Sequence, residues 1–316
     1  MSPLLSKSRR DHRCNRKIYL KIFIGIGAIL VFLIIWGLTF GNRLDIILYS
    51  PLISPKEWCE VQPCVEINIF GTKLILVKPS SSIFVYFLGF QTVFIGAYLL
   101  SIREGHASRV WWGIALLLWG LGAIFAGTSY QLFSYEIKCA GRQYCVWTSW
   151  WEIIYLILSV GSIDAMFIAL TYSCITPKYR KISLAYALFS FFSYCIIVLV
   201  GAYLPNQFMI SFELMVLFLV PNVLFFFLLN AWRYRRTLNP MDKSLTIMWI
   251  SLGIIIGLYF LYYILGITDM LWNFGIWFSE NDVLHIGLIA WMFYVYFTVS
   301  KYVKDRNSND NKSLTS

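Results

Sequence analysis

The stretch SWWEIIYLILSVGSIDAMFIALTYS occupies residues 149–173 and decides the fold. It is an almost unbroken apolar run, with one carboxylate near its start, Glu152, and a second at its centre, Asp164. Such a run meets the requirement of about 20 mostly apolar residues for a helix that crosses a hydrocarbon core about 30 Å thick. A charged Asp at the centre of a spanning helix costs about 2.5–3.5 kcal/mol on insertion scales. We therefore expect a membrane-spanning helix whose acids face other protein and not lipid.

The composition of the whole chain is that of a membrane protein. Hydrophobic residues make up 59% of the chain and charged residues 13%, whereas about a quarter of a soluble chain is charged. Aromatic residues reach 18%, and amphipathic rings collect at bilayer interfaces. Eight stretches are long and apolar enough to span a bilayer, at roughly 18–40, 82–102, 110–133, 149–173, 182–204, 208–231, 245–267 and 283–300.

These spans predict an all-α integral membrane protein with about eight transmembrane helices, an N-terminal anchor followed by a seven-helix bundle. The first apolar run, IFIGIGAILVFLIIWGLTF, is longer than the h-region of a signal peptide and lacks a small-residue cleavage pattern, so we expect a retained anchor. The predicted organisation is a basic N-terminus (1–17), the anchor (18–40), an extracytoplasmic cap loop (41–81), the bundle (82–300) and a disordered polar tail (301–316).

The distribution of Lys and Arg predicts the orientation. With eight spans, 20 of the 26 Lys and Arg residues lie on the side of the two termini and six on the other side. Because cytoplasmic loops carry the excess of these residues, we expect both termini in the cytoplasm and the protein in a plasma or bacterial inner membrane. This segregation explains the net charge of +10 without a nucleic-acid partner. The lipid bilayer is the expected partner.

Four cysteines lie in the two longest loops on the expected exterior. An even number outside is the pattern of an oxidising environment. Four cysteines allow three pairings. We favour Cys59–Cys64 and Cys139–Cys145 because each pair closes a short loop, and cross-linking of the two loops is the alternative. In the first of these loops, directly after Cys64, the stretch VEINIFGTKLILV (65–77) alternates in the pattern of two short strands joined by a turn. A disulfide would hold this otherwise marginal hairpin as a small cap.

Polar residues near the exterior ends of four spans form one predicted layer. Its members are Thr128, Ser129, Tyr130, Gln131, Glu152, Glu213, Asp282 and His285. His285 is the only histidine within a predicted span, and Asp282, three residues earlier, shares its helix face. The layer predicts a polar pocket that opens outward. The alternative is a set of solvated helix ends with a hydrogen-bonded interfacial histidine.

A deeper polar layer comprises Gln91, Asp164 and Asn222. Asp164 follows Glu152 by twelve residues, which is about 18 Å along a helix. Pro221, just before Asn222, removes a backbone donor and can kink its span at mid-depth. Asp164 serves either as a protonated hydrogen-bond donor to a neighbouring helix or in a ligand or ion path.

Small residues predict close contacts between helices. Gly120, Gly122 and Ala126 lie in the third span, and Gly253 and Gly257 lie in the seventh. We expect both groups inside the bundle. The alternative is glycine that faces lipid without a role.

Leaving out the first span, the seven remaining helices have polar residues closing the second (GTSYQ, 127–131), a carboxylate opening the third (WWEIIYL, 150–156) and a histidine opening the last (NDVLHIGLIAW, 281–291). This arrangement resembles the alkaline-ceramidase-like membrane hydrolases, and that resemblance implies a zinc site of three histidines. Phe133 and Ile289 stand about where further histidines belong. The chain has only three histidines in total, so we expect no metal and no other cofactor.

Three functions remain after the sequence is read. The leading interpretation is receptor-like binding of a small molecule or lipid by Gln131, Glu152, Glu213 and His285, with Asp164 deeper in the bundle. An intramembrane lipid-directed hydrolase would use His285 as general base, oriented by Asp282, with an acid such as Glu152. A transporter would need the deeper layer to be reached from both faces. No Walker or GxSxG motif is present.

Overall fold

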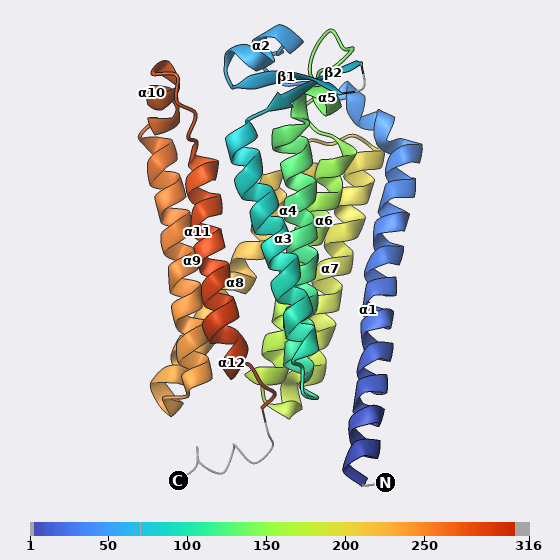
Figure 1. The fold of residues 1–316 in the computed structure, drawn as a ribbon, viewed down its shortest axis with the longest axis vertical. Coiled ribbons are helices and arrows are strands. Elements are labelled where there is room, and N and C mark those ends of the chain that lie inside the picture. The colour runs from blue at the N-terminus through green and yellow to red at the C-terminus, as the bar shows by residue number, and fades with distance from the viewer. Residues whose placement is uncertain (1–2, 70, 307–316) are drawn as a thin grey trace.

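The protein is an all-α membrane protein. A computed structural model describes residues 3–69 and 71–306, with side chains described for 20–68 and 71–306. Eight helices are long and apolar enough to cross a membrane, and they stand side by side in Figure 1. They are α1 (Pro3–Phe40), α3 (Pro79–Ser101), α4 (Ala107–Ala126), α6 (Trp150–Ser173), α7 (Arg180–Tyr203), α8 (Phe212–Thr237), α9 (Pro240–Ile264) and α11 (Glu280–Tyr294).

The remaining elements are short. Two of the long helices continue through π-helical turns, α4 into η2 (Gly127–Leu132) and α11 through η5 (Val295–Val299) into α12 (Ser300–Tyr302). The others are η1 (Gly41–Ile46), α2 (Pro55–Glu60), β1 (Cys64–Ile69), β2 (Thr72–Val77), α5 (Ser134–Lys138), η3 (Pro177–Tyr179), η4 (Phe208–Ile210) and α10 (Ile267–Asn273).

Local sequence signals start several of these helices. The side chain of Ser211 accepts a hydrogen bond from the backbone N–H of Leu214 at the start of α8. Asn239 does the same for Met241 at the start of α9, where Pro240 occupies the first helical position. Ser, Asn and a following proline are preferred there because they satisfy or remove the free N–H groups of the first turn.

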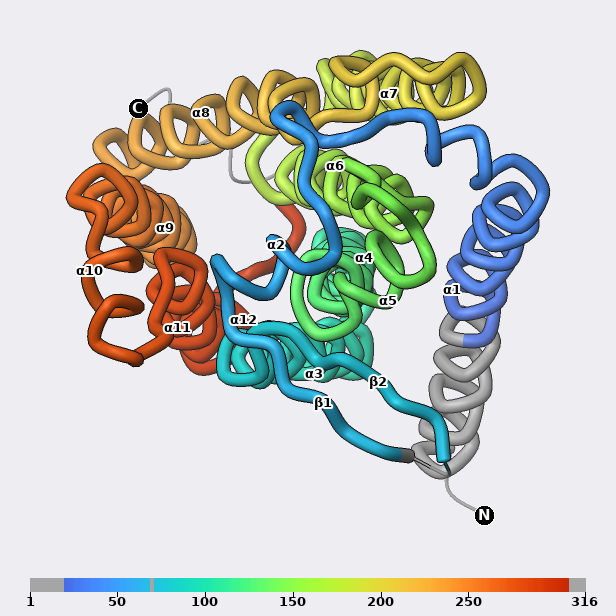
Figure 2. The backbone as a smooth tube through the Cα atoms, turned by 90° about the horizontal axis from the view of Figure 1, so that it is seen from above, coloured from blue at the N-terminus to red at the C-terminus, as the bar shows by residue number. Residues whose placement is uncertain are grey.

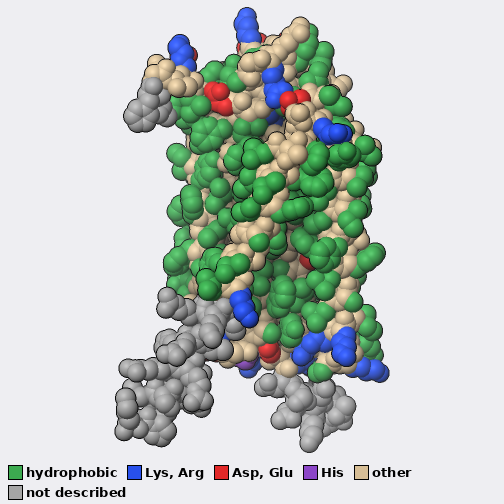
Figure 3. All heavy atoms as spheres, turned by 90° about the vertical axis from the view of Figure 1, so that its right-hand side faces the viewer, with side chains coloured by type: hydrophobic (Ala, Val, Ile, Leu, Met, Phe, Trp, Pro, Cys, Tyr) green, Lys and Arg blue, Asp and Glu red, His purple; other side chains and the backbone are tan. Residues whose placement is uncertain are grey.

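The surface has the polarity of a membrane-spanning body. Figure 3 shows hydrophobic side chains over the middle of the visible face, with Lys, Arg and acidic side chains gathered near its two ends. We call the end that carries α2 and the hairpin β1–β2 the cap end, and the other end of the bundle the opposite end. Figure 1 places the start of α1 and helix α12 at that opposite end.

Helix α6 forms the centre of the bundle. The most extensive helix contacts join α4 to α6 and α3 to α4, and α6 also contacts α7 and α8. Viewed from the cap end, α3, α4, α6, α8, α9 and α11 follow one another around the body, with α7 outside α6 and α1 at the edge (Figure 2). In α6, 83% of the apolar membrane-spanning stretch is buried inside the protein, compared with 11% in α1. The stretch that decides the fold is therefore its most enclosed segment.

Glycines bring α3 and α4 unusually close together. A Cβ atom added at Gly120 would lie 2.6 Å from the carbonyl oxygen of Gly89, and one at Gly96 would lie 2.8 Å from that of Gly113. Gly253 and Gly257 have no atom within 4 Å of such a Cβ and are exposed on α9. The expectation that they lie inside the bundle was wrong, because the face of α9 that carries them points away from the helices packed against it.

The cap is a small covalently closed unit. Disulfides join Cys59 to Cys64 and Cys139 to Cys145, which is the pairing favoured above. Strand β1 pairs antiparallel with β2, and the backbone N–H of Ile75 in β2 donates to the Glu136 carboxylate at 2.7 Å. This bond fixes the hairpin to α5. An isolated two-stranded hairpin is marginal in water, so the attachment to α5 explains why the hairpin forms here.

A polar network closes the opposite end of the bundle. The Arg233 guanidinium contacts the buried Asp242 carboxylate at 2.9 Å and the carbonyl oxygen of Cys174 at 2.7 Å. The Asn230 side chain accepts a hydrogen bond from the Trp249 indole at 3.1 Å. The buried residues of α9 all fall between Met241 and Trp249. Helices α8 and α9 are therefore locked to α6 at this end, while the cap-end part of α9 keeps exposed surface.

An aromatic contact near the cap end joins helix α1 to α6. The indole of Trp150, at the start of α6, lies against Gly37 and donates to the carbonyl oxygen of Leu33. A Cβ atom at Gly37 would overlap that indole, whereas one at Gly27 would meet nothing within 4 Å. The missing side chain at residue 37 is thus what lets α1 approach α6.

We expect Gly37→Ala to weaken the docking of α1, because the added methyl group needs the space that the Trp150 indole fills. Overpacking of this kind costs roughly 1–3 kcal/mol. The thermal midpoint of the purified protein in detergent should fall, and Gly27→Ala, on the same helix, should leave it unchanged. Equal midpoints for the two variants would contradict the proposed role of Gly37.

Candidate functional site

A buried ion pair lies beneath the cap. The Lys138 ammonium, at the end of α5, contacts Glu152 Oε1, in the first turn of α6, at 2.6 Å. The two side chains are 1% and 2% exposed. Lys138 also donates to the carbonyl oxygen of Trp147 at 3.1 Å and to the Tyr49 hydroxyl at 3.3 Å. The Thr148 hydroxyl donates to the other carboxylate oxygen of Glu152 at 2.9 Å.

These contacts favour the ammonium form of Lys138. Burial by itself lowers the pKa of Lys138, but attraction by Glu152 and contact with Tyr49 outweigh it, so the pKa is raised above its ordinary value. Desolvating two ions costs several kcal/mol each, and good geometry with additional hydrogen bonds is what offsets that cost. Glu152 was expected near water as a ligand or catalytic group. In the structure its charge is neutralised internally by Lys138.

The π-helical turn η2 presents two further members of the predicted layer next to this pair. Tyr130 lies with its ring 4.9 Å from the Lys138 ammonium and 6.0 Å from the Tyr155 ring in an edge-on arrangement. It still keeps 40% of its surface exposed. Gln131 is buried, and its side-chain oxygen has no hydrogen-bond partner among the described residues. Single π-helical turns occur frequently at functional sites because they re-aim side chains.

Polar groups of α9 and α11 face the same layer from the other side. Tyr259 of α9 lies within electrostatic range of both Tyr155 and Glu280. The Tyr262 hydroxyl donates to the carbonyl oxygen of Phe278 at 2.7 Å, which ties α9 to the start of α11. His285 is half-buried, and its Nδ1 atom has no hydrogen-bond partner within the described part of the chain.

Lys78 completes this layer, and sequence reasoning missed it as a site residue. It stands between β2 and α3 with a φ of 48°, a left-handed conformation that costs a non-glycine residue about 1–2 kcal/mol. Its ammonium lies 5.4 Å from the centre of the Trp277 ring and within electrostatic range of Glu280 and Lys138. Burial lowers the pKa of Lys78 below its ordinary value. The signal in the sequence was a lysine directly before Pro79, which does not reveal its inward direction.

Two acids of the predicted layer have other positions or roles. Glu213 is exposed in the first turn of α8, and no hydrogen bond or ion pair among the described residues joins it to the other members. Asp282 is buried, and its Oδ2 atom accepts from the backbone N–H of Ser279 at 2.6 Å and from its hydroxyl at 3.1 Å. This is a capping box at the start of α11. The Asp282 carboxylate therefore starts a helix, although it lies within electrostatic range of His285.

The deeper layer is divided between two interfaces. Gln91 donates to the carbonyl oxygen of Ile289, which joins α3 to α11. Asn222 accepts from the Tyr186 hydroxyl at 3.2 Å and donates to the carbonyl oxygen of Phe218 at 3.0 Å. Asp164 is 3% exposed, so it does not face lipid. It lies near Tyr186, so it joins Asn222 and not Gln91.

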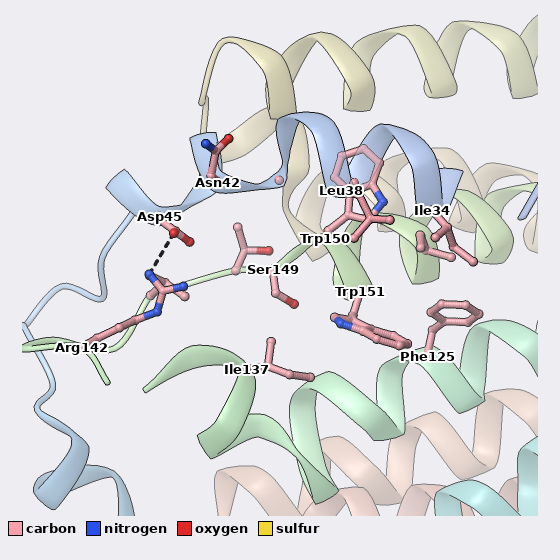
Figure 4. A pocket seen from close by; sticks show the side chains of 15 residues that line it. Ile34, Leu38, Asn42, Asp45, Phe125, Ile137, Arg142, Ser149, Trp150 and Trp151 are labelled. Carbon is pink, nitrogen blue, oxygen red and sulfur yellow. Dashed lines mark ion pairs between the residues drawn. The ribbon is translucent and has the colours of Figure 1, made fainter. Parts of the chain in front are cut away.

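A cavity of about 470 Å³ adjoins the ion pair on its α1 side. Figure 4 shows it between the end of α1 with η1 on one side and α5 with the start of α6 on the other. Thr148, which donates to Glu152, lines it. No cluster of three or more metal-ligating side chains occurs in the part of the chain that the structure describes.

Fold and site together define an integral membrane protein with a seven-helix bundle, an additional N-terminal helix and a polar layer under a disulfide-closed cap. The chain belongs to a family described as "Family of unknown function (DUF6962)", whose match covers residues 83–304. That range runs from α3 to the end of α12 and leaves out α1 and most of the cap. No curated protein and no solved structure matches the chain.

The buried ion pair should be strongly coupled. Removing one partner by Glu152→Gln or Lys138→Met leaves an unpaired group in the interior, which we expect to cost about 3–5 kcal/mol of unfolding free energy. The double variant should lose clearly less than the sum of the two single losses. Since the pKa of Lys138 is raised, this stabilisation is complete at neutral pH and disappears only as the pH rises past that pKa.

The measurement is a double-mutant cycle from unfolding titrations of the detergent-solubilised protein. The matched control is the surface pair of Lys73 and Glu66, 2.7 Å apart but well exposed, where Glu66→Gln should change little. Additive losses at Lys138 and Glu152 would show that the two groups are not coupled.

Proposed function

We propose that the chain is a multi-pass protein of a plasma or inner membrane that binds a small amphipathic molecule or a lipid entering from the cap end. In this proposal the cap lies outside the cell and both termini lie in the cytoplasm, as the distribution of Lys and Arg predicts. Binding takes place within the bundle, between η2 and α6 on one side and α9 and α11 on the other.

One observation carries this proposal: polar groups without protein partners gather around the layer at the cap end. Among the described residues, the Gln131 side-chain oxygen and His285 Nδ1 have no hydrogen-bond partner. The Lys78 ammonium, beside the Trp277 ring and within electrostatic range of Glu280, lies in the same layer. Buried polar groups in folded proteins are nearly always paired, and an exception calls for an explanation. A bound polar headgroup would supply the missing partners.

The packing of α9 supports the same location. Its buried residues end at Trp249, so its cap-end half does not close against α6. Tyr130, Tyr155 and Tyr259 then provide aromatic and hydroxyl surface in this layer. Tyrosine suits an amphipathic ligand because its ring is apolar and its hydroxyl forms hydrogen bonds.

The residue roles differ from those in the initial hypothesis. Gln131 and His285 would contact the headgroup because their side-chain atoms have no partner among the described residues. Lys78 would join them because its ammonium lies in the same layer. Glu152 would act indirectly by holding Lys138 beside the Tyr130 ring. Glu213 has no part in this site. The lowered pKa of Lys78 favours an anionic or strongly accepting headgroup, since a nearby negative charge would stabilise its ammonium form.

Ligand binding is tested with oleate and oleyl alcohol, which share a chain and differ in headgroup charge. We expect the wild type to retain oleate in native mass spectrometry. Lys78→Gln should weaken oleate binding about tenfold or more, because a hydrogen bond to a charged group contributes about 1.5–3 kcal/mol. His285→Ala should weaken binding by a smaller factor. Lys56→Gln and Glu213→Gln are the controls, and equal oleate binding by all of these proteins would refute the assignment.

Access from the cap end is tested separately with an introduced thiol. A cysteine at Tyr259 should react with a membrane-impermeant methanethiosulfonate added outside intact cells, because water reaches this layer. A cysteine at Ile254 is the matched control on the same helix, since this exposed position faces lipid, where thiols do not ionise. Labelling at residue 259 only from the cytoplasmic side would invert the proposed orientation, and labelling from neither side would show a closed layer.

A further inference from the structure

We propose that the cavity between α1 and α6 is a binding site for a phospholipid of the leaflet at the cap end, with the lipid phosphate on Arg142 and one acyl chain along the apolar wall. This site lies outside the seven-helix interior and is independent of the function proposed above. Its α1 wall also lies outside the range that the family match covers.

The polarity of the cavity changes with depth in the way that a lipid requires. Its polar lining groups are at the cap end, at Asn42, Asp45, Arg142, Thr148 and Ser149. Its apolar groups lie deeper along α1, α4 and α6, at Ile34, Leu38, Phe125, Trp151 and Ile154. Ile34 precedes Asn42 by eight residues, or about 12 Å along a helix. A headgroup and the first part of a chain span such a distance.

The apolar wall is open to the membrane. Only 11% of the apolar membrane-spanning stretch of α1 is buried inside the protein, and Leu38 is exposed. The Trp151 ring lies 5.3 Å from the Phe125 ring, tilted against it, and is itself partly exposed, so the two rings form an aromatic surface beneath α1. A volume of about 470 Å³ is within the usual range of about 300–1,000 Å³ for ligand sites. Since lipid surrounds this part of the chain, an acyl chain can enter sideways.

The polar mouth offers donors for a phosphate. Arg142 contacts Asp45 at 3.0 Å through one guanidinium nitrogen, and the two side chains are only partly exposed. A guanidinium has five N–H donors, so the Asp45 contact leaves others available for a phosphate. The dashed line in Figure 4 marks this pair at the edge of the cavity.

Ser149 provides the second, independent indication of a ligand. Its hydroxyl lines the cavity, is nine-tenths buried, and has no hydrogen-bond partner among the described residues. Figure 4 places Ser149 between Asp45 and Trp151, at the boundary of the polar and apolar parts. A buried hydroxyl without a partner costs about 1–3 kcal/mol. A phosphate or ester oxygen of a lipid would accept a hydrogen bond from it.

The contact between Trp150 and Gly37 keeps the cavity open. Because the Trp150 indole fills the space beside residue 37, it fixes the distance between α1 and α6. Both residues also line the cavity. Helix α1 cannot close onto Trp151 without displacing that indole, so the space is available to a lipid.

The test is lipid retention by the full chain, measured by native mass spectrometry after exchange into detergent with phosphatidylcholine or phosphatidylglycerol. We expect one retained phospholipid at this site. Arg142→Gln should weaken retention about tenfold or more, and Ile34→Trp, which fills the apolar wall, should abolish it. Arg43→Gln and Ile35→Trp are the matched controls, because Arg43 lies on the Tyr203 ring and residue 35 does not line the cavity.

The two lipids distinguish the headgroup contacts. Preference for phosphatidylcholine that is lost in Asp45→Asn would place the choline ammonium on Asp45, and equal retention of both lipids would leave the phosphate as the group recognised. Each result supports the proposal if retention depends on Arg142. Retention that is the same in wild type, Arg142→Gln and Ile34→Trp, all with unchanged thermal midpoints, would overturn it. If Ile34→Trp lowers the thermal midpoint, the comparison of Arg142→Gln with Arg142→Lys tests the proposal instead. We then expect Arg142→Lys to retain part of the phospholipid that Arg142→Gln loses.

Discussion

The contact between Lys138 and Glu152 is the constraint on which the cap end depends. It joins α5, which carries the hairpin through Glu136, to the first turn of the central helix α6. Because both charges are buried, neither can leave the other without exposing an unpaired ion to a low-dielectric interior. The pair therefore fixes the height of the cap above the bundle. It also holds the ammonium under the ring of Tyr130, which places that ring in the polar layer.

The two ends of the bundle are built differently. At the opposite end, Arg233 and Asn230 both contact the Asp242 carboxylate, and Arg233 also donates to the Cys174 carbonyl oxygen, so α8 and α9 are tied to the end of α6. At the cap end, α9 and α11 retain partly exposed tyrosines, and His285 Nδ1 has no hydrogen-bond partner among the described residues. The cap end of the bundle is thus the less tightly packed end, and we propose the ligand site there. This asymmetry is the physical basis of the proposed binding site.

Helix α1 adds a surface that the seven-helix bundle does not have by itself. Its small contact area, set by Gly37 and Trp150, leaves an amphipathic space beside α6. The ion pair separates this space from the polar layer inside the bundle, since Thr148 lines the cavity and donates to Glu152.

The sequence by itself determined the all-α membrane class, the eight spans, the hairpin and the inward position of Asp164, because hydrophobic length, strand alternation and the cost of a charge in lipid act locally along the chain. Only the tertiary structure decided which polar residues meet. From the sequence alone, Lys138 and Lys78 look like solvated loop residues. In the structure the turn after α5 brings Lys138 to Glu152, and the left-handed backbone of Lys78 directs its side chain to Trp277. Glu213 fits the layer by depth, yet its direction around α8 separates it. The depth of a side chain in the membrane follows from counting residues along its helix, whereas the direction in which it points depends on how the helices pack.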